Sequence, residues 1–190
     1  MHVFVAGDVA MTGTAAEHER FQTICGRYPW KWHVAMGDHD RPLSVFQKYW
    51  GPPHGVTEFR GWRFIGVDTS EKRFTEEEAR WLHRQIDHDA IIYMHMPPRM
   101  ESWAFHSLSA ECTARFLGVL DDFPERIRAC FFGHIHSYDR KEYRGIPLVV
   151  TGGGGAESRY LGSKGYEGTR PFQAMIFDTA NGKISLFDEG

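Results

Sequence analysis

The chain has 190 residues, of which 42% are hydrophobic and 25% charged, a composition that predicts one globular domain over residues 1–190. Its formal net charge of -3 argues against broad binding to nucleic acid or anionic membranes, and no stretch approaches the roughly 20 apolar residues of a membrane span. The start lacks the features of a signal peptide and the three widely spaced cysteines predict reduced thiols, so we expect a cytoplasmic protein.

Strands and helices are predicted to alternate along most of the chain, with hairpins towards its end. Apolar runs bounded by turn residues predict strands over residues 2–6, 32–36, 57–59, 62–67, 90–94, 129–132, 141–144, 147–151, 172–177 and 183–187. Amphipathic spacing predicts helices over residues 14–26, 43–50, 75–86 and 110–120. Asn181-Gly182 predicts a type I′ turn in the last hairpin, and the Gly-rich stretch 152–168 predicts a mobile surface loop.

Two of these helices begin with a recognisable signal. Thr14 followed by Glu17, and Thr75 followed by Glu78, have the spacing of a capping box. In the first of the two helices, the residues expected to pack on the sheet are Ala15, Phe21 and Ile24.

Four of the predicted strands end in residues of the metal-binding type. They run into Gly7-Asp8, Gly37-Asp38-His39-Asp40, His95-Met96-Pro97-Pro98 and Gly133-His134-Ile135-His136. Taken singly, each Asp could simply form a turn and each His could be solvated. The joint pattern favours a metal site, because α/β sheets place their chemistry at the carboxyl ends of strands. Oxygen and nitrogen donors without a thiolate suit zinc, manganese or iron.

In this order the four motifs resemble the second to fifth motifs of the calcineurin-like metallophosphoesterases, with Asp38 where the family usually has Asn. Residues 133–140 and the Gly-rich stretch 151–156 are similar to the purple acid phosphatase and cyclic-nucleotide phosphodiesterase branches. The resemblance implies an α/β fold of two packed mixed β-sheets flanked by helices. The family's first motif, Asp-x-His, has no counterpart because only six residues precede Gly7, so the first strand-helix unit is expected to be missing.

The resemblance also implies which residues hold metal. Asp8 would bridge two ions, with Asp38, His95 and His134 completing one site and His136 belonging to the other. The second site would keep two ligands only, so we expect one firmly bound divalent ion. Conceivable donors from elsewhere in the chain are His18, His33, His54 and His106. The added charge of Asp38 should strengthen the retained site.

The expected reaction is hydrolysis of a small phosphoester, a monoester or a diester, by a metal-activated water. His39 matches the family position that faces the leaving group, and Asp40 would orient it. Arg99 and Arg140 are candidates to hold the phosphate.

A catalytically weakened or inactive relative that serves as a metal-binding or interaction protein is the alternative. The missing first motif favours this alternative, whereas the retained His39 and Asp40 favour the enzyme. The missing unit should also leave the strand 2–6 at a sheet edge, which predicts a homo-oligomer formed through that strand.

Overall fold

The computed structural model describes residues 1–152 and 173–188. Its elements are, in chain order, β1 (His2–Val5), α1 (Ala15–Cys25), β2 (Lys31–Val34), α2 (Leu43–Trp50), β3 (Gly55–Phe59), β4 (Trp62–Val67), α3 (Glu76–Gln85), β5 (Ala90–Met94), the 3-10 turn η1 (Glu101–Trp103), α4 (Ala110–Asp122), β6 (Ile127–Phe132), β7 (Asp139–Tyr143), β8 (Ile146–Val150), β9 (Gln173–Asp178) and β10 (Lys183–Asp188).

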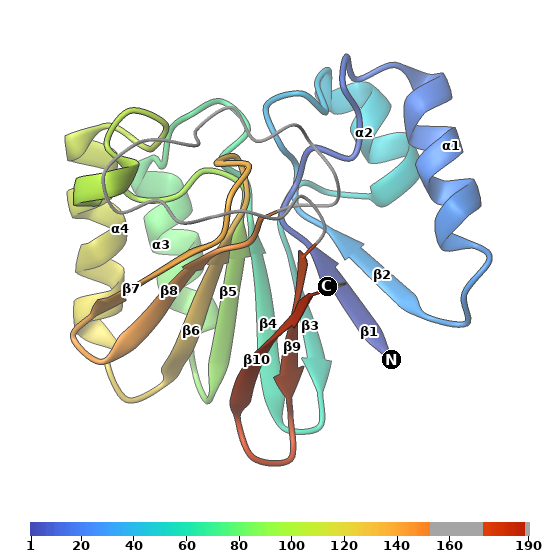
Figure 1. Ribbon diagram of the computed structural model, residues 1–190. Coiled ribbons are helices and arrows are strands. Elements are labelled where there is room, and N and C mark those ends of the chain that lie inside the picture. Colours follow the sequence, from blue (N-terminus) through green and yellow to red (C-terminus); the bar gives the residue numbers. More distant parts are fainter. Residues whose placement is uncertain (153–172, 189–190) are drawn as a thin grey trace.

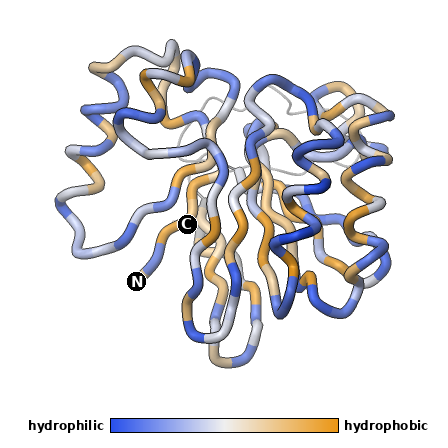
Figure 2. The backbone as a smooth tube through the Cα atoms, turned by 180° about the vertical axis from the view of Figure 1, so that it is seen from behind, coloured by the Kyte–Doolittle hydropathy of each residue, from blue (hydrophilic) through white to orange (hydrophobic). Residues whose placement is uncertain are grey.

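A six-stranded mixed sheet with the order β3-β4-β5-β6-β8-β7 forms the centre of the fold (Figure 1). The four inner strands β4, β5, β6 and β8 run parallel, and the antiparallel hairpin partners β3 and β7 form its two edges. All five residues of β5 are buried, as expected for an inner parallel strand covered on both faces. In Figure 2 these central strands form the most hydrophobic part of the chain.

The two faces of this sheet are covered differently. Helices α3 and α4 cover one face, where the main core includes Leu82, Phe116 and Phe132. On the other face, Phe4 of β1 and Phe177 of β9 pack against a cluster that contains Phe64, Ile91 and Tyr93. The parallel pair β1-β2 and the antiparallel pair β9-β10 therefore form a second layer, which confirms the predicted sandwich of β-sheets flanked by helices.

The predicted capping boxes are both present. The Thr14 hydroxyl accepts the Glu17 backbone N–H and the Glu17 side chain returns to the Thr14 N–H, and Thr75 and Glu78 form the same arrangement at the start of α3. Helix α2 has the predicted bounds. These local predictions succeed because a cap satisfies backbone groups within one turn of helix.

The buried face of α1 differs from the prediction. Ala15 and Ile24 are exposed, whereas His18 and Cys25 are buried. The reason is that the His18 ring is used as a polar bridge: its Nδ1 accepts the indole N–H of Trp50 at 3.1 Å, and its Nε2 lies 3.3 Å from the Asp40 carbonyl oxygen. Helix α1 thus turns towards α2 and the loop after β2.

Two turns also differ from the prediction. The turn between β7 and β8 is Arg144-Gly145, one residue earlier than expected, and both residues have positive φ. The last hairpin has a four-residue loop over 179–182 in place of a two-residue turn, because the Asp178 carboxylate accepts the Ala180 backbone N–H and binds the Asn181 side chain.

Nearly all of the predicted Gly-rich loop, residues 153–168, lies outside the described residues. Within the described part of the chain, no helix is long and apolar enough to cross a membrane, and all three cysteines are free thiols. Strand β1 pairs with β2 alone among the described strands, and its residues are half-buried.

Candidate metal centre

Two carboxylates and two imidazoles meet where four strands end. Asp8 follows β1, Asp38 follows β2, and His95 and His134 follow β5 and β6. The carboxyl ends of these strands lie together, where the two sheets approach each other (Figure 1). The centre therefore takes one pair of donors from each sheet.

The donor atoms of the four side chains all lie within 4.8 Å of one another. The His95 Nε2 is 3.1 Å from Asp8 Oδ2 and 3.0 Å from Asp38 Oδ1, and the His134 Nδ1 is 3.2 Å from Asp38 Oδ1. The His95 side chain is only 1% exposed, whereas those of Asp8 and Asp38 are 17% and 12% exposed. The cluster is therefore buried on the side of His95 and accessible to solvent on the side of the two carboxylates.

The ring of His95 shows that the cluster suits a cation. Its Nδ1 lies 2.7 Å from the Ala6 carbonyl oxygen, which can only accept a hydrogen bond, so Nδ1 carries a proton. In the neutral imidazole Nε2 then has a lone pair that faces two carboxylates and a second imidazole. A divalent ion between these donors resolves the repulsion, and such a carbonyl contact is what commonly orients a ligating histidine. The donor set therefore fits a divalent metal ion of the zinc, manganese or iron type.

A glycine before three of the four donors, Asp8, Asp38 and His134, makes this close approach possible. A Cβ at Gly37 would lie 2.1 Å from Asp8 Oδ1, and one at Gly133 would lie 2.5 Å from the Ala6 carbonyl oxygen. At Gly7, where φ is +86°, a Cβ would lie 2.6 Å from His95 Nδ1. The Gly-Asp and Gly-His pairs in the sequence are thus a packing requirement of the centre.

The charges of the centre are strongly coupled. Burial raises the pKa of Asp38, but hydrogen bonds from His134, His95 and Lys72 outweigh it and hold that pKa well below its ordinary value. The pKa of Asp8 is also lowered: burial opposes this, and the contact with His95 prevails. Burial lowers the pKa of His95, yet Asp38 and Asp8 raise it to about 10. Without a metal, a proton on His95 therefore provides the positive charge that the carboxylates require.

Asp40 has a different position from the one expected. Its fully buried carboxylate accepts the backbone N–H groups of Asp8, Ala10 and Gly37 at 2.8 to 3.0 Å. The prediction that Asp40 orients the His39 ring is therefore wrong, because its lone pairs join the loop of Asp8 to the loop of Asp38.

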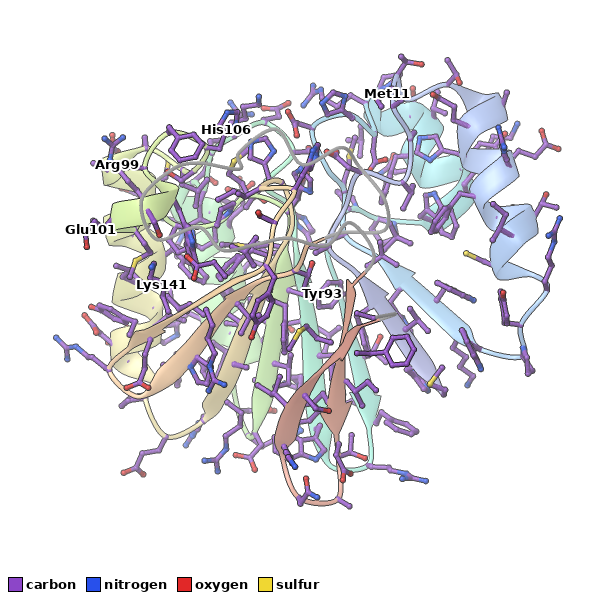
Figure 3. The ribbon with its side chains drawn as sticks, viewed as in Figure 1. Met11, Tyr93, Arg99, Glu101, His106 and Lys141 are labelled. Carbon is purple, nitrogen blue, oxygen red and sulfur yellow. The ribbon has the colours of Figure 1, made fainter. Side chains whose placement is uncertain are left out.

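The exposed His39 lies beside Asp8. Its backbone N–H donates to Asp8 Oδ1 at 3.0 Å, and its ring Nδ1 lies 2.8 Å from the carbonyl oxygen of Met11, which Figure 3 labels. Because that carbonyl takes Nδ1–H, the ring Nε2 is left for a group that enters from solvent.

Three other predicted residues lie apart from the four donors. His136 follows His134 by two residues but is not part of the cluster, and its place in a second site stays a prediction. Figure 3 places Arg99 on the α4 side, where its backbone N–H donates to the Thr113 hydroxyl, and Arg140 is exposed on the edge strand β7. In the described part of the chain, the ion-pair partners of Asp8 and Asp38 are His95, His134 and Lys72, and neither Arg99 nor Arg140 is among them.

Two basic residues border the centre: His106, one of the four conceivable donors from elsewhere in the chain, and Lys72, which no motif singled out. Lys72 Nζ is 2.9 Å from Asp38 Oδ2, and His106 Nδ1 is 3.4 Å from His134 Nε2. Burial lowers the pKa of His106, and the charges of His134 and Lys72 lower it further. Figure 3 shows His106 at the same end of the molecule as Met11. The sequence did contain a signal for Lys72: it lies in the loop after β4, and β4 ends on the same side of the sheet as β5 and β6.

Comparison with known proteins gives similarity in structure only. No protein-family profile and no curated protein matches the sequence. A dimetal phosphatase from Danio rerio superposes with a TM-score of 0.61 at 12% identity, over 79% of this chain and 71% of that one. GAP50, described as the anchor in the inner membrane complex of Plasmodium, superposes with a TM-score of 0.70 at 12% identity, over 98% and 77%. Phosphopantetheinyl hydrolase from Mycobacterium tuberculosis superposes with a TM-score of 0.50 at 15% identity, over 78% and 77%.

The fold and the donor cluster define a class of α/β sandwich with a candidate metal centre at the carboxyl ends of its parallel strands. This fold is the one of the calcineurin-like metallophosphoesterases, which confirms at the level of the fold the resemblance in the motifs.

Proposed function

We propose that this protein is a metal-dependent phosphoester hydrolase that acts on a small phosphomonoester or phosphodiester. The observation that carries the proposal is the cluster of Asp8, Asp38, His95 and His134, whose donor atoms lie within 4.8 Å of one another. Structures of a dimetal phosphatase and of a hydrolase with the same fold support the reaction class.

The four residues of the cluster would hold one divalent ion firmly. When bound, such an ion supplies charge for the phosphoryl oxygens and activates a water for attack on phosphorus. The fixed tautomer of His95 presents Nε2 to the ion, and the Asp40 carboxylate keeps the loops of Asp8 and Asp38 at their spacing.

His39 would donate a proton to the leaving group. In its imidazolium form Nδ1–H would stay on the Met11 carbonyl while Nε2–H would donate to the leaving-group oxygen. The backbone N–H of His39 also donates to Asp8 Oδ1, so the proposed acid on the loop after β2 is hydrogen-bonded to a donor on the loop after β1. The Met11 carbonyl oxygen, in place of the Asp40 carboxylate, orients the ring in this role.

The proposal is tested with generic aryl phosphate monoesters and diesters in the presence of manganese, zinc or iron(II). We expect turnover by the wild type, loss of at least about 100-fold in kcat/KM for Asp8→Ala, and a smaller loss in kcat for His39→Gln with unchanged metal content. A metal-loaded wild type that hydrolyses none of these substrates would contradict the proposal.

A second candidate is an interaction protein that keeps the metal for structure. GAP50, which superposes over 98% of this chain, is described as an anchor. The half-buried strand β1, which pairs with β2 alone among the described strands, offers an edge for association with a second copy. Sedimentation of the metal-loaded chain tests this: a dimer that Val3→Pro dissociates would support it.

Three broader features complete the proposal. We take residues 1–190 as a single domain, the second metal site as absent or weakly held, and the protein as cytoplasmic. The three free cysteines are consistent with a reducing compartment.

A further inference from the structure

The two oxygens of the Asp38 carboxylate face different partners. Oδ1 belongs to the donor cluster, 3.0 Å from His95 Nε2 and 3.2 Å from His134 Nδ1. Oδ2 lies 2.9 Å from the ammonium nitrogen of Lys72. One carboxylate therefore connects the candidate metal position to a positively charged side chain. An asparagine at this place could offer only one oxygen for these two partners.

The backbone of Lys72 is held close to the centre by its loop. Its φ is +58°, and its N–H donates to the Thr69 carbonyl oxygen at 2.9 Å. The Thr69 hydroxyl accepts the backbone N–H of Met96 at 2.9 Å, and Met96 directly follows His95. The loop is thus attached to the strand end that supplies a metal ligand.

Lys72 can be reached by a ligand from solvent. Its side chain is 60% exposed, whereas that of Asp38 is 12% exposed. An ammonium group has three N–H donors, so one can remain on Asp38 while the others bind an oxygen that enters the centre.

The charge at the centre indicates what that ligand is. With both carboxylates ionised, both imidazoles neutral and one divalent ion present, the four donors and the ion have no net charge. Lys72 adds one positive charge directly beside them. A positive centre with N–H donors on its open side suits an anion with several oxygens, and phosphate has this chemistry.

We propose that Lys72 binds a non-bridging phosphoryl oxygen next to the metal. The proposal rests on the proposed function, because it assigns a substrate-binding residue to that same centre. Asp38 positions Lys72, and the two residues act as a pair. One metal ion together with one lysine would then neutralise the phosphoryl charge.

The test uses inorganic phosphate as the probe and titration calorimetry on metal-loaded protein. The variants are Lys72→Met, which removes the charge, and Lys72→Arg, which keeps it. Lys183→Met is the matched control, since Lys183 is exposed beside the β9-β10 turn at the far end of the sheet (Figure 1). Metal affinity is measured separately for every variant in the absence of phosphate.

We expect Lys72→Met to weaken phosphate binding by about 10-fold to 100-fold, as for loss of a charge-assisted hydrogen bond. Its metal affinity should be equal to or tighter than wild type, because a like charge has been removed. Lys72→Arg should stay within about 5-fold of wild type for phosphate, and Lys183→Met should equal it.

The two affinities separate this inference from the proposed function. Unchanged phosphate affinity in Lys72→Met overturns the inference, and so does a parallel loss of metal affinity, which would show a merely structural role. A wild type that binds no phosphate when loaded with metal also overturns it. Lys72-dependent phosphate binding without hydrolysis would support the inference while contradicting the proposed hydrolase activity.

Discussion

Replacing Gly37 by alanine tests whether the glycines of the motifs are needed for packing. The backbone φ of Gly37 is not in the left-handed region, so an alanine is not strained by its own conformation. Its Cβ, however, would lie 2.1 Å from Asp8 Oδ1 and 2.4 Å from the Asp8 backbone nitrogen. Part of this clash is with backbone, so a side-chain rotation cannot relieve it.

The expected loss follows from that geometry. The loop of Asp8 must move away from β2, although the Asp40 carboxylate holds it through two backbone N–H groups. Such overpacking typically costs about 1–3 kcal/mol in the free energy of unfolding. For a chain of this size it corresponds to a fall of about 2–12 °C in Tm. Metal affinity should fall as well, because Asp8 is displaced from the other donors.

The assay is thermal and urea unfolding of the metal-free protein, followed by metal titration. Gly118→Ala is the matched control: a Cβ at Gly118 in α4 meets no atom within 4 Å, so this change should raise the free energy of unfolding by roughly 0.5–1 kcal/mol. A Gly37→Ala variant with wild-type Tm and wild-type metal affinity would refute the packing role of the glycine.

Three further predictions concern groups around the centre. Asp40→Asn turns an N–H donor towards buried backbone N–H groups and should cost about 1–3 kcal/mol in the free energy of unfolding by denaturant, whereas Asp178→Asn, at the exposed end of β9, should cost far less. In the metal-free protein, kept so with a chelator, the folded-state pKa of His95 is about 10 and its unfolded value is 6.5, so the stabilisation by its proton is present below pH 6.5 and lost as the pH rises to 10. The free energy of unfolding in urea should therefore fall by roughly 1–4 kcal/mol over this range. A His95→Gln variant whose stability has the same pH dependence as wild type would exclude this cause. Trp50→Phe removes the hydrogen-bond donor to buried His18 and should lower the free energy of unfolding by about 1–3 kcal/mol, while the metal content stays unchanged. A loss of metal in this variant would show that the contact of His18 with the Asp40 carbonyl oxygen also positions the metal donors.

The positions of the four donors were predictable because each depends on local signals. An apolar strand that ends in an Asp or His, after a glycine or shortly before a proline, places a donor at the carboxyl end of the strand, and parallel strands bring these ends together. This reasoning found Asp8, Asp38, His95 and His134. The capping boxes at Thr14 and Thr75 were predictable for the same reason, since each is completed within one turn.

The remaining parts of the centre depend on contacts between distant segments. Asp40 lies next to His39 in the sequence, which suggested a partner for the ring, yet its oxygens bind backbone groups about thirty residues earlier. Lys72 reaches Asp38 from a loop whose conformation requires a positive φ at a lysine. The inward turn of His18 likewise depends on Trp50, which only the packing of α1 on α2 brings close.

Metal per chain, measured by elemental analysis of wild type, His134→Ala and His136→Ala, tests the single-ion centre most directly. The two histidines share one loop, but only His134 belongs to the donor cluster. We predict about one ion per chain in the wild type and in His136→Ala, and little or none in His134→Ala. Two ions in the wild type, none at all, or equal loss in both variants would contradict the account.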